Sequence, residues 1–371
     1  MSRKMKALLM IVIIIIVLVA VVISFLATPR FGRTPRDSKT PLEIIERIEA
    51  SPHYRDGRFH NFDARSVRLG GDSPHRFFEK VEGLRPESKL PSIEIDLFKI
   101  EADEDILVWL GHSALYIRTG GVSFLVDPSL LTGSPIWFIN QPFLGSDVFK
   151  PNDIPKIDYL LISHDHFDHL DYDTINALRD RIGKVVCGLG TGEHFRRWNF
   201  AEEDIIELDW NESAVLKGDI TLHILPARHY SGRISFGSDK TLWVSFMIAA
   251  PSLNIYLSGD TSYGSHFKQI GEKFDIDLAI IEFGQYNEAW RDSHIMPDDI
   301  GNVISDLNPK RAFMTHHAKY ALAKHHWNEP LEIVSKLNEQ EGFDIITPMM
   351  GELVYLDDLS QEFSKWWVGI K

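Results

Sequence analysis

The sequence predicts an α/β protein in which two β-sheets pack against each other and helices cover their outer faces. After residue 105, short apolar runs typical of strands alternate with helical patterns. The runs fall into two successive groups, which favours two sheets over one. The chain has 371 residues, of which 44% are hydrophobic and 25% charged, an ordinary globular mixture with enough apolar side chains for a large core.

The first 27 residues predict a membrane anchor. Residues 7–27 are apolar except for Ser24, and a helix of that length measures roughly 30 Å, the thickness of a bilayer's hydrocarbon layer. A cleaved signal peptide is the alternative, but its apolar stretch usually has about 7–15 residues. We therefore expect a cytoplasmic tail and transmembrane signal-anchor over residues 1–27. This implies a single-pass membrane protein with the rest of its chain on the periplasmic or extracellular side.

Residues 28–56 are expected to form a linker and an N-terminal helix. Pro29, Pro35 and Pro41 stand among polar residues, as in extended linkers. Leu42, Ile44, Ile45 and Ile48 then follow a helical spacing. We expect the remaining residues, 57–371, to form one folded domain.

Within that domain the apolar patterns predict the order of the elements. Strands are expected over residues 106–110, 114–118, 122–126, 159–162, 184–187, 220–225, 242–248, 253–257, 278–281 and 311–315. Residues 119–121, Thr-Gly-Gly, predict a hairpin turn. Helices are expected over residues 172–181, 192–198, 265–273, 297–307 and 328–339.

Charge and cysteine content exclude several classes of function. The chain carries a net charge of −14, and the first 40 residues hold seven basic groups and one acid, so the remainder carries −20. Such a body repels a phosphate backbone, and we expect no nucleic-acid partner. The single cysteine, Cys187, excludes an intramolecular disulfide framework and a thiolate-rich zinc site. Nothing in the sequence indicates an oligomeric state.

A histidine motif after one strand indicates a metal site. Residues 163–169 read Ser-His-Asp-His-Phe-Asp-His, directly after the apolar run 159–162. Alternate residues at a strand end face one way, so His164 and His166 can point at one cation. Asp168 and His169 follow where the chain turns and can reach a second cation. Imidazole and carboxylate suit Zn²⁺ well and Fe or Mn acceptably.

Two metals need more ligands than one segment supplies, and later strand ends offer candidates. His229, Asp260 and His316 each lie just past an apolar strand pattern. Taken singly, each of them is more readily explained as an ordinary structural residue. Together with the motif at 164–169, their placement favours a shared site.

This order of motifs resembles the metallo-β-lactamase superfamily, in which an αββα sandwich carries metal ligands at successive strand ends. The resemblance implies two divalent metal ions, with Zn²⁺ favoured. It implies a first metal held by His164, His166 and His229, a second held by Asp168, His169 and His316, and Asp260 bridging them. Asp127 matches an early acidic residue that supports the histidine loop in the family. The family has an aromatic residue where this chain has His317, so choosing His316 as the last ligand rests on register.

Flanking motifs are similar to one branch of that superfamily. Residues 57–61, 109–113, 163–170, 259–263 and 351–352 together resemble the N-acylphosphatidylethanolamine-hydrolysing phospholipase D branch, and bacterial ascorbate-lactone hydrolases share part of the pattern. The resemblance implies a zinc-dependent phosphodiesterase acting on a lipid or small-molecule phosphodiester. The predicted N-terminal anchor adds the membrane as a partner. A hydroxide shared by the two metals would attack, with Asp168 orienting it. His294 matches a family histidine near the metals and is our candidate proton donor, with simple packing as the alternative.

Two other functions remain open at this point. The same metals could serve a lactone or acyl hydrolase of the β-lactam type. A metal-binding envelope protein without turnover is the non-enzymatic alternative, although no member of the ligand set is missing. His112 is expected either to support a metal ligand or to be a hydrogen-bonded core residue, and the core residue is favoured. Asp165 and His317 are expected outside the ligand set, either supporting the ligands or at the surface.

Overall fold

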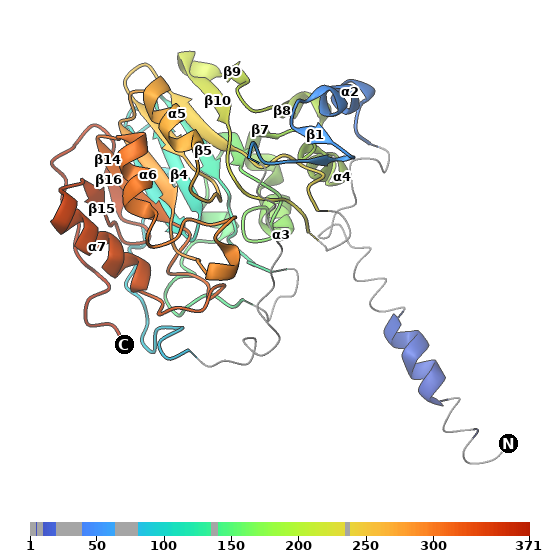
Figure 1. The fold of residues 1–371 in the computed structure, drawn as a ribbon, viewed down its shortest axis with the longest axis horizontal. Helices are drawn as coiled ribbons and strands as arrows, with labels where there is room; N and C mark the ends of the chain where they lie inside the picture. Colours follow the sequence, from blue (N-terminus) through green and yellow to red (C-terminus); the bar gives the residue numbers. More distant parts are fainter. Residues whose placement is uncertain (1–4, 6–9, 20–38, 64–80, 135–139, 234–237) are drawn as a thin grey trace.

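Two seven-stranded sheets lie face to face in the computed structural model, which describes residues 5, 10–19, 39–63, 81–134, 140–233 and 238–371 (Figure 1). The first has the order β16-β3-β4-β5-β6-β7-β8 and the second β15-β14-β13-β12-β11-β10-β9. The strands of the first sheet are β3 (Ile106–Gly111), β4 (Ala114–Thr119), β5 (Val122–Val126), β6 (Ile157–Ile162), β7 (Ile182–Gly188), β8 (Ile205–Leu208) and β16 (Leu353–Tyr355). Those of the second are β9 (Ser213–Val215), β10 (Thr221–Leu225), β11 (Ser245–Ala249), β12 (Asn254–Leu257), β13 (Leu278–Glu282), β14 (Arg311–Thr315) and β15 (Ile345–Ile346). A small hairpin, β1 (Tyr54–Arg55) with β2 (Arg58–Phe59), lies apart from both.

The two sheets share one connection pattern. In the first, β3, β4 and β5 pair antiparallel, and β5 to β8 pair parallel. In the second, β9 to β12 pair antiparallel, and β12 to β15 pair parallel. The predicted turn between β4 and β5 is present, and Gly120 and Gly121 adopt φ values of +57° and +70° there. Consecutive positive φ values match the twist of a tight hairpin and favour glycine.

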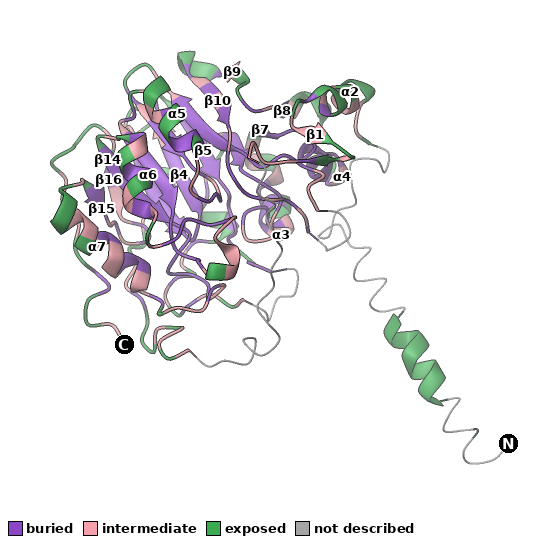
Figure 2. Cartoon of the chain, in the orientation of Figure 1, coloured by how far each residue is buried: buried purple, intermediate pink, exposed green. Residues whose placement is uncertain are grey.

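Helices cover the outer faces of both sheets. They are α3 (Tyr172–Leu178), α4 (Gly192–Arg197), α5 (His266–Lys273), α6 (Ile300–Leu307) and α7 (Glu329–Glu341), whereas α2 (Leu42–Ala50) packs Ile48 against the core between the sheets. Side chains of β3 alternate, with Leu107 and Trp109 in the core between the sheets, and Val108 and Leu110 in the core beneath α3 and α4. A third core lies between the second sheet and α5, α6 and α7. Because both faces of each sheet are covered, the central strands are mostly apolar and Figure 2 shows them buried.

The predicted α/β architecture with two packed sheets is confirmed. Each expected strand and each expected helix of the domain overlaps an observed element. The strands β8, β9, β15 and β16 were not expected, because they are two to four residues long and have weak apolar patterns. The helix expected after the linker is α2, which packs Ile48 into the core, while Arg47 Nη1 donates to the Glu207 carbonyl at 2.8 Å.

The predicted membrane anchor requires a correction. Across the described residues, no helix has the length and apolar character that a membrane crossing needs. Residues 10–19 are helical. The rest of the predicted segment, 7–9 and 20–27, lies outside the described residues. The prediction of a single-pass membrane location is therefore wrong on this finding.

Candidate metal centre

The candidate ligands follow strands whose carboxyl ends meet at one edge of the two sheets. The segment 164–169 follows β6 in the first sheet. His229 follows β10, Asp260 follows β12 and His316 directly follows β14, and these three strands run in the same direction within the second sheet. Each sheet therefore contributes some of the candidate ligands.

Three imidazoles and one carboxylate form a first group. His164 Nε2 lies 2.8 Å from His166 Nδ1, and His229 Nε2 lies 3.2 Å from the same nitrogen. Asp260 Oδ2 is 3.8 Å from His164 Nε2 and 3.7 Å from His229 Nε2. All four ligand atoms lie within 4.8 Å of one another, close enough to hold one ion. Three ring nitrogens aimed at one point cannot all be satisfied by hydrogen bonds to each other, which fits a cation between them.

A second group lies beside the first. His316 Nε2 is 3.5 Å from Asp168 Oδ2, and His169 Nε2 is 3.6 Å from the same oxygen. His112 completes this group, with its Nε2 at 2.9 Å from Asp168 Oδ2. His112 is fully buried, and its ring contacts the candidate ligand Asp168, which matches the ligand-supporting alternative rather than the favoured one of a core residue alone.

Asp260 belongs to both groups. Its Oδ1 lies 3.2 Å from His169 Nε2, and its Oδ2 lies 3.3 Å from His316 Nε2, in addition to the contacts with the first group. Asp260 Oδ1, His169 Nε2 and His316 Nε2 are all buried, and none has a hydrogen-bond partner among the described residues. Buried polar atoms without partners are costly. These atoms face each other, so their arrangement fits a pair of metal ions with Asp260 between them.

The electrostatics of the two groups differ. Burial holds the pKa of His164 and of His229 well below the usual range, which keeps both imidazoles in the neutral form that binds metals. Burial also lowers the pKa of His169, but the carboxylates of Asp260, Asp168 and Asp127 outweigh it, so this pKa lies well above the usual range. The second group thus attracts a cation, either a proton or a metal ion.

Further residues hold the candidate ligands in place. Asp127 Oδ2 accepts hydrogen bonds from Ser163 Oγ at 2.5 Å and from His169 Nδ1 at 2.9 Å. Asp127 therefore supports the histidine loop, as the resemblance implied. Asn61, in the motif at 57–61, donates through Nδ2 to the His229 carbonyl at 2.9 Å. His229 Nδ1 pairs with the Ser293 carbonyl at 2.8 Å, which leaves Nε2 for the site. Such partners fix the tautomer and orientation of metal-binding histidines.

His294 lies against both groups, close to a carboxylate that the sequence analysis missed. Its ring centroid is 5.2 Å from that of His229 and 5.4 Å from that of His316. Its Nδ1 is 3.3 Å from Oε1 of Glu282, the last residue of β13. Burial lowers the pKa of His294, but Glu282 outweighs this and raises it above the usual value. Glu282 could have been found from the sequence, because it directly follows the apolar run 278–281.

Two neighbouring residues turn away from both groups. His317 Nε2 pairs with the Met314 carbonyl at 3.0 Å, and its ring lies 4.9 Å from that of Trp109. His316, not His317, thus faces the other candidate ligands. Asp165 accepts from Gly232 N at 2.7 Å and lies 3.1 Å from a ring nitrogen of His194, outside both groups. Both residues are buried, which rules out the surface alternative for them, and both lie outside the ligand groups as expected.

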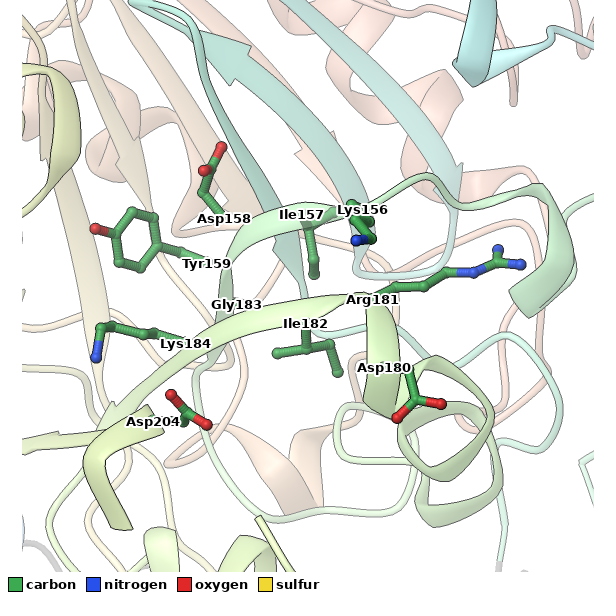
Figure 3. A pocket seen from close by; sticks show the side chains of 10 residues that line it. All are labelled: Lys156, Ile157, Asp158, Tyr159, Asp180, Arg181, Ile182, Gly183, Lys184 and Asp204. Carbon is green, nitrogen blue, oxygen red and sulfur yellow. The ribbon is translucent and has the colours of Figure 1, made fainter. Parts of the chain in front are cut away.

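A hollow of about 490 Å³ lies at the opposite ends of β6 and β7 (Figure 3). Figure 3 shows Ile157 and Asp158, which begin β6, beside Ile182 and Gly183, which begin β7. The candidate ligands instead follow Ile162 at the other end of β6. The charged side chains of the hollow are three bases and three acids: Lys156, Arg181, Lys184, Asp158, Asp180 and Asp204. This hollow is therefore separate from the metal centre.

Comparison with known proteins agrees with the fold and the motifs. Residues 123–317, just over half the chain, match the family model described as "Beta-lactamase superfamily domain". An uncharacterized protein of Mycobacterium tuberculosis is 32% identical over 317 residues, covering 82% of this chain and 85% of the relative. The N-acyl-phosphatidylethanolamine-hydrolyzing phospholipase D 1 of Caenorhabditis elegans is 26% identical over 303 residues, covering 73% and 83%.

A solved structure shares the fold. Igni18, a metallo hydrolase from Ignicoccus hospitalis, superposes with a TM-score of 0.53 at 20% identity, covering 67% of this chain and 97% of its own. The family match spans the strand ends that carry the seven predicted ligands, and the predicted resemblance is confirmed. The chain therefore belongs to the metallo-β-lactamase superfamily, and its relatives include a phospholipase D that hydrolyses N-acylphosphatidylethanolamine.

Proposed function

We propose that the protein is a metal-dependent hydrolase that cleaves a lipid or small-molecule phosphodiester, as in the N-acylphosphatidylethanolamine-hydrolysing phospholipase D branch. The observation that carries the proposal is the pair of His/Asp groups that share Asp260. Similarity to the nematode phospholipase D along 73% of the chain supports a phosphodiester over other substrates. The donor set of imidazoles and carboxylates favours zinc, with iron and manganese as possible occupants.

The residues of this chain have distinct roles in the proposed reaction. Two bound cations at this site would supply an activated water and Lewis acidity toward the phosphoryl oxygens. Asp168, held by His112, would orient the attacking water. A bond forms between the water oxygen and phosphorus, and the bond from phosphorus to the alcohol oxygen breaks. The water releases a proton to solvent, and His294 gives a proton to the leaving alcohol, so that a phosphomonoester and an alcohol result.

Metal content and substrate range test the proposal together. We expect about two metal equivalents per chain by elemental analysis, as expected for a two-ion hydrolase site. We also expect turnover of bis(p-nitrophenyl) phosphate and of N-acylphosphatidylethanolamine in mixed micelles, measured by absorbance and mass spectrometry. A lactone and a β-lactam should remain intact. Hydrolysis of the lactone or the β-lactam alone would replace the phosphodiesterase with an acyl hydrolase on the same metals.

A pair of variants distinguishes the loss of a candidate ligand from the loss of a histidine elsewhere in the fold. His164→Ala removes a nitrogen of the first group and should abolish both metal retention and activity. His223→Ala is the matched control, since His223 lies on β10 with its ring 5.1 Å from Phe274 and in neither ligand group. Full activity of His164→Ala would show that the ligand set is wrong. Stable metal binding without turnover of any substrate would favour a non-catalytic metal-binding protein.

A further inference from the structure

Glu282 is a buried carboxylate in contact with two histidines of the centre. It ends β13 and is 2% exposed. Its Oε1 accepts from the backbone N of Ile295 at 3.0 Å and lies 3.3 Å from His294 Nδ1. Its Oε2 lies 3.8 Å from His316 Nδ1. The carboxylate therefore lies behind both imidazoles.

The surroundings of Glu282 make His294 its main ionic partner. Within the described part of the chain, no lysine or arginine forms an ion pair with this carboxylate. A buried charge without a partner is strongly unfavourable. The short contact is to His294, and the backbone bond from Ile295 fixes the carboxylate beside that ring. The pair is thus held in one geometry by its own strand and by the residue after the histidine.

The contact with Glu282 determines which ring nitrogen of His294 can face a substrate. The two nitrogens of an imidazole are separated by one carbon and point outward in diverging directions, so Nε2 of His294 is directed away from Glu282 when Nδ1 faces it. The ring lies 5.2 Å from His229 in the first group and 5.4 Å from His316 in the second. Its side chain is 10% exposed, against 1% for His316. His294 is therefore beside both groups and is less deeply buried than His316.

We propose that Glu282 is a positioning residue that holds His294 with Nδ1–H toward its own carboxylate, so that Nε2–H donates a proton to the leaving oxygen. This inference rests on the proposed function and adds a residue to it. When the bond between phosphorus and the alcohol oxygen breaks, the proton moves from Nε2 to that oxygen. His294 becomes neutral and keeps its proton on Nδ1, facing the Glu282 carboxylate, and its Nε2 is later protonated again by water. A carboxylate behind a histidine orients it in this way in hydrolytic triads.

Substrates with different leaving groups test the role of Glu282. In Glu282→Gln, turnover of N-acylphosphatidylethanolamine should fall by about 10–100-fold, because its alkoxide needs the proton. Turnover of bis(p-nitrophenyl) phosphate should change by less than about threefold, because p-nitrophenolate leaves without a proton. His294→Gln should show the same split, and the double variant should be no worse than His294→Gln alone. An equal fall with both substrates, or no fall with either, would overturn the proposal.

A measurement that needs no turnover tests the same contact. In zinc-loaded protein labelled with ¹⁵N-histidine, we expect the Nδ1 of His294 to be protonated in the wild type. In Glu282→Gln, we expect His294 to carry its proton on Nε2 instead, or to be a mixture of the two tautomers. The His294 signals are assigned by their absence from His294→Gln. An unchanged tautomer, or loss of a metal equivalent from Glu282→Gln, would refute a role through His294.

A control variant and the wild type separate this inference from the proposed function. Glu207 is another buried carboxylate, 3% exposed and paired with Arg196 at 2.6 Å. Glu207→Gln should lower stability and leave the ratio of the two turnover rates unchanged. If the wild type cleaves neither phosphodiester, the phosphodiesterase proposal fails, while the tautomer measurement still decides whether Glu282 orients His294.

Discussion

Replacing Asp127 by asparagine should weaken one of the two metal positions without unfolding the protein. Asp127 Oδ2 receives two hydrogen bonds, from Ser163 Oγ and from His169 Nδ1 at 2.9 Å. An asparagine with its amide oxygen bonded to Ser163 N presents an NH₂ group to His169. The favoured tautomer then carries its proton on Nε2, which points at Asp260 and can no longer bind a metal. The backbone tolerates the change, because Asp127 has φ +40° and asparagine adopts such angles readily.

The expected size follows from the bond that is lost. A hydrogen bond to a charged group contributes about 1.5–3 kcal/mol, and each 1.4 kcal/mol is about tenfold in affinity. Zinc affinity of the second position should therefore fall by about 10–100-fold, the range typical of residues that support a metal ligand. Competition with a chromogenic chelator measures this affinity, and thermal unfolding of the metal-free protein monitors the fold.

The control for this variant lies at the other end of β6. Asp158 accepts from both Ser123 N and Ser123 Oγ at 3.0 Å, so Asp158→Asn removes a similar carboxylate far from the ligands. It should leave both zinc affinities unchanged. The reasoning about Asp127 is refuted if Asp127→Asn keeps both affinities within about threefold of the wild type, a change below about 1 kcal/mol.

Two further perturbations concern Lys319 and Gly259, which lie close in sequence to the candidate ligands His316 and Asp260. Burial lowers the pKa of Lys319 to about 8, so the unfolded chain binds more protons between pH about 8 and 10.5, and stability should rise with pH across that window. Denaturant unfolding of Lys319→Met should lack this rise, whereas a rise equal to that of the wild type would disprove the assignment. Gly259 has φ +56°, and a Cβ there would lie 2.8 Å from the Cβ of Ser163. Gly259→Ala should therefore lose roughly 1–3 kcal/mol of stability and displace Asp260, with fewer metal equivalents by elemental analysis; unchanged melting and metal content would contradict this.

Much of the fold could be predicted because its strands have both faces covered. A strand such as Leu278–Glu282 is then a continuous apolar run, which is visible without knowledge of its neighbours. The short edge strands carry no such signal, since Ser213–Val215 has no fully buried residue and pairs with only one neighbour. Their positions depend on tertiary pairing, which local pattern does not encode.

The candidate site was predictable where polar residues interrupt apolar strand ends. His229, Asp260 and His316 follow this rule, and the structure brings them together with the histidine motif. The contact between His112 and Asp168 was not predictable, because it depends on a turn in which His112 adopts φ +55°. Glu282 was missed although it obeys the same rule, since the expected strand stopped one residue before it.

The division of the ligands between the sheets has a consequence for the order of folding. The segment after β6 belongs to one half of the molecule, while His229, Asp260 and His316 belong to the other. Neither half alone contains all the ligands of either group. High-affinity metal binding therefore requires that the two halves have packed together. Once bound, each ion would act as a cross-link over the seam between the sheets, where removing the ions with a chelator would first loosen the molecule.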